Sequence, residues 1–124
     1  MGRYKEGGNN SESVITQQII TPPSTVTVTS NAGTVTRDNR INNFTNSSAA
    51  AMTITLSTTD AEDGDIVVVR IFDFSAVSQS ISWVNTESSD TTPPASSNGS
   101  TTLPRSVGFM YNEATSKWRC LMNQ

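Results

Sequence analysis

The stretch DAEDGDIVVVRIFDF, residues 60–74, places four carboxylates around one glycine, directly before a long apolar run. Carboxylate oxygens are ligands that Ca²⁺ prefers, and two carboxylates can also hydrolyse a glycosidic bond. The spacing matches no EF-hand loop, because the bidentate glutamate that such a loop needs downstream is missing. The acidic residues around the glycine are Asp60, Glu62, Asp63 and Asp65.

The same stretch is also a strong turn signal. Asp63-Gly64 is a dipeptide typical of tight turns, and it stands immediately before the strand pattern that begins at Ile66. No pair among the 11 acidic residues has a spacing that singles it out for glycoside hydrolysis. We therefore interpret residues 60–65 as a turn that leads into a strand, and we assign no metal ligand there.

The residue types of other common catalytic sites are scarce. The sequence contains no histidine, which excludes a Ser-His-Asp triad, a Cys-His dyad and a His-based zinc site. Cys120 is the only cysteine, so no internal disulfide can form, and its position between Trp118 and Met122 is typical of a small buried side chain. We predict a protein that is not an enzyme, with no catalytic residue and no cofactor.

The charge and hydropathy of the chain argue against binding to nucleic acid or to a membrane. The net charge is -3, and the eight basic residues are scattered from Arg3 to Arg119, without the basic stripe that a phosphate backbone requires. No run of 18 apolar residues occurs, and the N-terminal MGRYKEGGNN has no apolar signal core. We expect a soluble protein that binds neither nucleic acid nor membrane.

Segments with a period of two recur along most of the chain and predict β-strands. The chain has 18 serines and 18 threonines, and the threonines alternate with valine, isoleucine and leucine, which is typical of pleated strands. Seven or eight short strands at a spacing of roughly 10 residues predict an all-β fold, an antiparallel, jelly-roll-like β-sandwich. The predicted strands are residues 25–30, 32–38, 40–44, 51–57, 65–74, 79–84, 106–112 and 117–122.

The segment 65–74 is apolar on both faces. One face carries Val67, Val69 and Ile71, and the other carries Ile66, Val68 and Phe72. Arg70 shares the second face, where its charge must meet a carboxylate or reach an edge. We therefore predict that Arg70 and Phe72 belong to a subunit interface.

The first 24 residues differ from the rest, and Pro22-Pro23 marks a boundary because proline is excluded from central strands. We predict an N-terminal arm over residues 1–24 and a β-sandwich domain over residues 25–124. A disordered tail is the alternative, but four side chains are too apolar for a solvated tail. These candidate attachment residues are Val14, Ile15, Ile19 and Ile20.

Two tryptophans and one long connection leave alternatives open. Trp83 and Trp118 lie among apolar neighbours and are expected in the core, but exposed rings would form a platform on which a sugar could stack. The segment 86–104 is longer than compact domains leave structureless, so we expect a functional or packed-down loop.

The sequence from Met52 to the C-terminus resembles modules of bacteriophage virion proteins, namely head fibres, decoration proteins and tail-fibre domains. The resemblance rests on ITLSTTDAEDGDIVVVRIFD, on SISWVN and on SVGFMYNEATSKWRCL, and it implies framework roles at the matching positions. It also implies an all-β module that commonly trimerises on the outside of a virion. The matching positions are Ile54, Asp63, Gly64, Ile66, Trp83, Tyr111 and Trp118.

From the resemblance we expect a non-enzymatic virion structural protein, either a capsid decoration protein or a short head fibre. It would be made in the host cytoplasm, form a homotrimer and bind the major capsid protein on the particle exterior. The alternative is a carbohydrate-binding module of the tail-fibre type that recognises a host surface glycan.

Overall fold

The structure is a computed structural model that describes residues 24–26, 31–46, 49–74 and 77–124. Every regular element within these ranges is a strand, so the all-β prediction is confirmed, and none of the described ranges contains a helix that could cross a membrane. One sheet has six strands, in the spatial order β1 (Ser24–Val26), β3 (Ile41–Asn46), β5 (Ile66–Asp73), β8 (Arg105–Asn112), β9 (Lys117–Asn123) and β7 (Thr86–Glu87). The second sheet has three strands, β2 (Ala32–Val35), β4 (Met52–Leu56) and β6 (Ile81–Val84).

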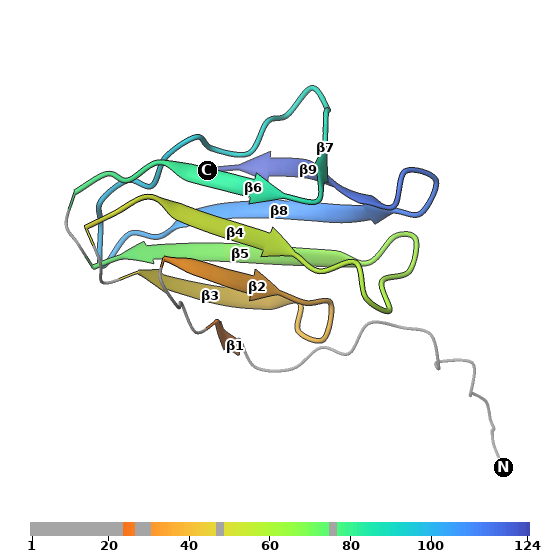
Figure 1. Cartoon of the computed structure of the whole chain (residues 1–124), viewed down its shortest axis with the longest axis horizontal. Coiled ribbons are helices and arrows are strands. Elements are labelled where there is room, and N and C mark those ends of the chain that lie inside the picture. Colours follow the sequence, from red (N-terminus) through yellow and green to blue (C-terminus); the bar gives the residue numbers. More distant parts are fainter. Residues whose placement is uncertain (1–23, 27–30, 47–48, 75–76) are drawn as a thin grey trace, which may run out of the picture.

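The first six strands alternate between the two sheets. β1, β3 and β5 are parallel neighbours in one sheet, and β2, β4 and β6 are parallel neighbours in the other. The chain forms a flattened coil with two strands in each turn, and Figure 1 shows β2, β4 and β6 as one layer over the six-stranded sheet. Parallel neighbours need a crossover connection, and here each crossover is a strand of the opposite sheet.

The predicted antiparallel, jelly-roll-like pairing is therefore wrong for most of the strands. Only β5 with β8 and β8 with β9 pair antiparallel among the strand pairs of the described residues. The β8–β9 hairpin over the turn at 113–116 keeps the antiparallel pairing predicted for the strands at 106–112 and 117–122. A period of two indicates which side chains share a face, but it carries no information on strand direction.

One apolar core fills the space between the two sheets. Alternation along the strands sends every second side chain inward, as the burial of Met52, Ile54 and Leu56 on β4 and of Val67, Val69 and Ile71 on β5 shows. The buried core consists of Val26, Val35, Phe44, Met52, Ile54, Leu56, Val67, Val69, Ile71, Ile81, Val107, Phe109, Tyr111, Trp118 and Cys120. Burial raises the pKa of the Cys120 thiol, in keeping with its predicted role as a small core side chain.

A β-bulge changes the face to which the end of β9 points. Phe109 pairs with Cys120, but Gly108 pairs with Met122, so Leu121 is an extra residue on β9. Met122 is therefore shifted out of the core and lies only partly buried, next to Gly108. The alternation of Trp118, Cys120 and Met122 in the sequence predicts one shared face for the three side chains, and for Met122 that prediction is wrong because of the bulge.

The segment 86–104 packs against the sheets. It begins with the two-residue strand β7, which pairs parallel with β9 and is too short to give a periodic signal in the sequence. Farther along, Ser96 forms an isolated antiparallel bridge with Ser80 at the edge beside β6. The predicted packed-down loop is thus observed.

The predicted arm lies almost entirely outside the described residues. Val14, Ile15, Ile19 and Ile20 all fall there, so the arm stays a prediction. The first described strand begins at Ser24, one residue before the start that we predicted for the β-domain.

Two strand glycines provide a matched test of the packing. A Cβ atom on Gly33 would lie 2.6 Å from Phe44 Cε2 and 3.0 Å from Val26 Cγ1, whereas a Cβ on Gly108 would lie 3.4 Å from Met122 Cβ. The Phe44 ring is fully buried and cannot swing away. We expect Gly33→Ala to lower the free energy of unfolding by about 1–3 kcal/mol and Gly108→Ala to change it by less than about 1 kcal/mol, measured by urea denaturation. Equal effects of the two changes would contradict this packing.

Candidate functional site

The acidic stretch forms the turn that precedes β5. Gly64 has a φ of 87°, a conformation that favours glycine, and its N–H donates to the Tyr111 carbonyl at 3.0 Å. The Tyr111 N–H in turn donates to the Asp65 carbonyl at 2.8 Å. These bonds join the start of β5 to the end of β8, and the predicted turn is confirmed.

Two carboxylates of the stretch have structural contacts. Asp65, which is 6% exposed, accepts from Arg37 Nε at 2.6 Å and Nη2 at 3.1 Å, and it also accepts from the Glu62 N–H at 2.8 Å. The hydrogen bond to Asp65 is the main cause that raises the pKa of Arg37. Asp63 Oδ1 accepts from the Glu113 N–H at 2.9 Å. The four carboxylates therefore do not converge on one point, and no metal-binding group of three or more acidic, histidine or cysteine side chains occurs among the described residues.

Both tryptophans take part in packing, Trp118 inside the core and Trp83 against it. Trp118 is 1% exposed, its indole N–H donates to the Ser57 carbonyl at 3.1 Å, and its ring meets the Tyr111 ring edge-on. Trp83 is partly buried, with its ring 5.2 Å from Phe109 and its N–H bonded to the Pro94 carbonyl at 2.8 Å. The structure gives both rings packing roles, and a sugar platform built on Trp118 is incompatible with its burial.

Arg70 and Phe72 lie on the outer face of the six-stranded sheet, where they are partly exposed. Their cross-strand partners are polar, since Arg70 pairs with Asn43 and Ser106 and Phe72 pairs with Thr45. Farther along the same face of β5, the apolar Ile41 pairs with Val68, which in turn pairs with Gly108 next to Met122. Arg70 Nε donates to Asn43 Oδ1 on the neighbouring strand at 2.8 Å. We refer to this surface as the outer patch, which consists of Ile41, Ile66, Val68, Arg70, Phe72 and Met122.

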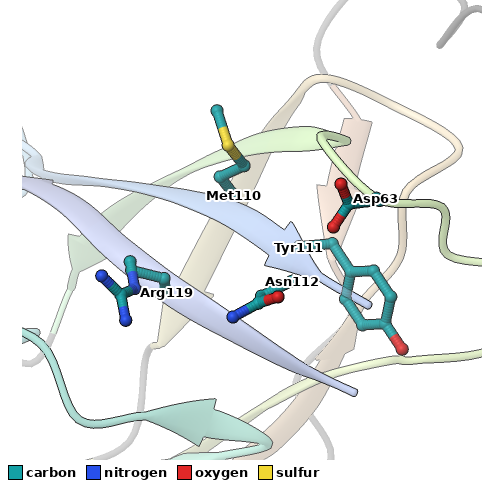
Figure 2. A pocket seen from close by; sticks show the side chains of 5 residues that line it. All are labelled: Asp63, Met110, Tyr111, Asn112 and Arg119. Carbon is teal, nitrogen blue, oxygen red and sulfur yellow. The ribbon is translucent and has the colours of Figure 1, made fainter. Parts of the chain in front are cut away.

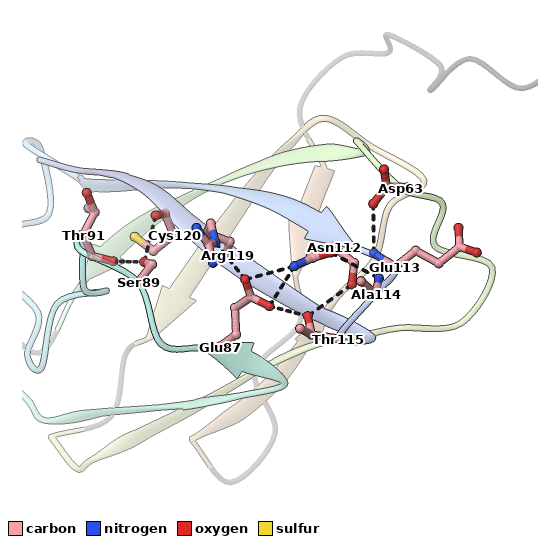
Figure 3. A network of polar contacts seen from close by, with 10 residues as sticks. All are labelled: Asp63, Glu87, Ser89, Thr91, Asn112, Glu113, Ala114, Thr115, Arg119 and Cys120. Atoms are coloured by element: carbon pink, nitrogen blue, oxygen red, sulfur yellow. Dashed lines mark hydrogen bonds and ion pairs between the residues drawn. The ribbon is translucent and has the colours of Figure 1, made fainter.

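A polar cluster surrounds Glu87 at the edge of the same sheet (Figure 3). The Glu87 carboxylate accepts from Arg119 Nε at 2.7 Å, from Asn112 Nδ2 at 3.3 Å and from the Thr115 hydroxyl. The hydrogen bond from Thr115, and next that from Arg119, lower the pKa of Glu87 below its ordinary value. Sequence analysis missed this cluster, because Glu87 lies 25 residues from Asn112 and 32 from Arg119 and no local motif joins them.

A hollow of about 320 Å³ adjoins this cluster (Figure 2). Met110 and Tyr111 extend to opposite sides of β8, and Asn112 lies between Arg119 and Asp63 in the view. We refer to it as the β8–β9 hollow, and it is lined by Asp63, Met110, Tyr111, Asn112 and Arg119.

Comparison with known proteins assigns no family. No family model matches the chain, and no curated protein matches it. Among solved structures, one chain of a "Structure of a chaperone-substrate complex" is similar, with a TM-score of 0.45 and 16% sequence identity. The match covers 82% of this chain but only 17% of that chain, and a likeness at this level supports no argument about function.

The turn at Gly64 can be tested by substitution. A Cβ there would meet no atom within 4 Å, so any cost of Gly64→Val comes from the backbone alone, at a φ that a β-branched residue resists. We expect Gly64→Val to lower the free energy of unfolding by roughly 1–3 kcal/mol, and Gly64→Asn to cost less, because asparagine tolerates this conformation.

Calcium provides the companion test. If the stretch acts only as a turn, Ca²⁺ or a chelator should leave the melting temperature unchanged. A large rise in melting temperature with Ca²⁺ would contradict the turn interpretation.

The Glu87 cluster predicts a pH dependence. A carboxyl whose pKa is lower in the folded chain adds stability above its unfolded pKa and loses that contribution as the pH falls through its folded pKa. We expect wild type to lose more stability than Glu87→Gln between about pH 6 and about pH 3, which brackets the ordinary glutamate pKa. Urea denaturation across this range measures the difference, and parallel pH profiles of the two proteins would show that the cluster adds nothing.

Proposed function

We propose that this chain is a non-enzymatic structural protein of a bacteriophage virion, a capsid decoration protein or short head fibre that assembles as a homotrimer on the particle exterior. The virion assignment rests on the resemblance of residues 52–124 to phage modules. The observation that carries the assembly role is the outer patch on the six-stranded sheet.

The outer patch is a largely apolar surface that the described residues leave partly exposed. Its side chains point away from the core, because the inward face of β5 is occupied by Val67, Val69 and Ile71. The three-stranded sheet covers the inner face of the six-stranded sheet, since residues of both sheets form one core. Burial of apolar surface of this kind against a partner lowers the free energy of the complex.

Another copy of the same chain is the occupant that fits best. Arg70 is the charge within the outer patch, and its Nε already has Asn43 as an acceptor in its own sheet. Because Asn43 already accepts from Arg70 Nε, a partner surface does not have to supply a carboxylate for this nitrogen. An acidic partner protein is therefore not required. Apolar faces of identical chains can then meet around a symmetry axis, with the rest of the guanidinium directed to the rim.

We assign attachment to the particle to residues 1–20 of the predicted arm. Its apolar side chains and strand-forming sequence suit an extended segment that lies along the major capsid protein or pairs with a sheet edge.

Sedimentation equilibrium tests the trimer with a matched pair of variants. Val68→Asp places a charge in the outer patch, whereas Val84→Asp makes the same change at a valine of the three-stranded sheet that is 38% exposed. We expect wild type and Val84→Asp to be trimers and Val68→Asp to be a folded monomer, with folding checked by circular dichroism. A monomeric wild type, or a trimeric Val68→Asp, would contradict the proposed interface.

A truncated chain that starts at Thr21 tests the arm. We expect it to fold and trimerise but not to co-sediment with particles that lack this protein, whereas the full chain binds them. Undiminished attachment of the truncated chain would place the anchor in the β-domain.

A further inference from the structure

The β8–β9 hollow brings together polar groups that are fixed in place yet retain bonding capacity. Arg119 Nε is fixed by Glu87 at 2.7 Å, and its two terminal nitrogens have no partner among the described residues. Asp63 Oδ1 is fixed by the Glu113 N–H, and its second oxygen has no partner within the described ranges. A guanidinium donor and a carboxylate acceptor are therefore presented from two different segments.

Asn112 occupies the middle of this arrangement. Its Nδ2 donates to both Glu87 oxygens at 3.3 Å, and its Oδ1 accepts from the Ala114 N–H at 3.1 Å. Because both ends of the amide are held, Asn112 keeps its orientation between Arg119 and Asp63 (Figure 2). Groups that are held before a ligand arrives lose little conformational entropy when it binds.

The apolar part of the hollow comes from Met110. Its side chain lies on the outer face of β8, since Met110 pairs with Ile66 on one side and with Arg119 on the other. An unbranched thioether adapts its shape to the surface that it meets. The hollow thus combines an adaptable apolar contact with a donor and an acceptor.

Charge narrows the class of ligand. Asp63 and Glu87 bring two carboxylates to this region, Glu113 adds a third beside Asp63, and Arg119 brings one guanidinium. The excess of negative charge disfavours phosphates and carboxylates as ligands. Neutral hydroxyls suit it, because each hydroxyl can donate to the Asp63 carboxylate and accept from the guanidinium.

We propose that the β8–β9 hollow is a binding subsite for a neutral saccharide. Separate hydroxyls of the sugar would contact Asp63 and Arg119 on the two sides of Asn112, and the C–H face of the sugar would contact Met110. The subsite does not depend on the proposed assembly role. It also differs from the platform predicted at Trp83 and Trp118.

Backbone amide NMR shifts of the full chain test the proposal. The probes are maltose, lactose, cellobiose and N,N′-diacetylchitobiose at millimolar concentration, with a chelator present. We expect at least one of these sugars to shift the amide signals of Asp63, Met110, Asn112 and Arg119. No shift with any of the four, or shifts that lie only elsewhere, would overturn the proposal.

Variants separate ligand binding from a purely structural role of the same contacts. Asp63→Asn keeps an acceptor for the Glu113 N–H but replaces one carboxylate oxygen with a donor, so we expect a folded chain with affinity at least about tenfold lower. Asp90→Asn changes an exposed acid outside the hollow and should leave the affinity unchanged. Equal affinity of wild type and Asp63→Asn would overturn the assignment of Asp63.

Discussion

The burial of a single apolar core between two sheets is the constraint on which the rest of the structure depends. Only 34% of the residues are hydrophobic, and the strands of both sheets direct side chains into this one space, including those of Trp118, Phe44 and Phe109. The ends of the strands must then be tied together by polar contacts. The Arg37–Asp65 ion pair does so next to the β2–β3 connection, and Glu87 does so where β7 meets the β8–β9 hairpin.

Sequence periodicity gave the faces of the strands but not their directions. Alternation in 65–74 separates Val67 and Val69 from Val68 and Phe72, and the same separation is observed. Parallel and antiparallel neighbours require the same alternation of side chains. The sequence pattern therefore did not indicate that neighbouring strands are parallel and are connected through the opposite sheet. Met122 was misplaced because a bulge depends on how β9 meets β8, which the sequence of β9 alone does not contain.

The polar cluster and the hollow show a second limit of sequence analysis. Asp63 was identified as a turn residue, and its contact with the hairpin 50 residues away follows only from the fold. Conversely, the tryptophans that drew attention as a sugar platform are held in or against the core. On this fold, Asp63 and Arg119 retain hydrogen-bonding groups without an intramolecular partner among the described residues, while large aromatic side chains stabilise the two layers.

The central claim is that the first six strands alternate between two sheets, so that their neighbours within each sheet are parallel. Nuclear Overhauser contacts between neighbouring strands test this claim most directly. The structure predicts in-register amide-to-Hα contacts between β4 and β6, around Ile54 and Trp83, and between β3 and β5, around Phe44 and Ile71. Strong Hα–Hα contacts are expected where β8 meets β5 and β9, since such contacts are typical of antiparallel pairs. Strong Hα–Hα contacts between β3 and β5 would contradict the account.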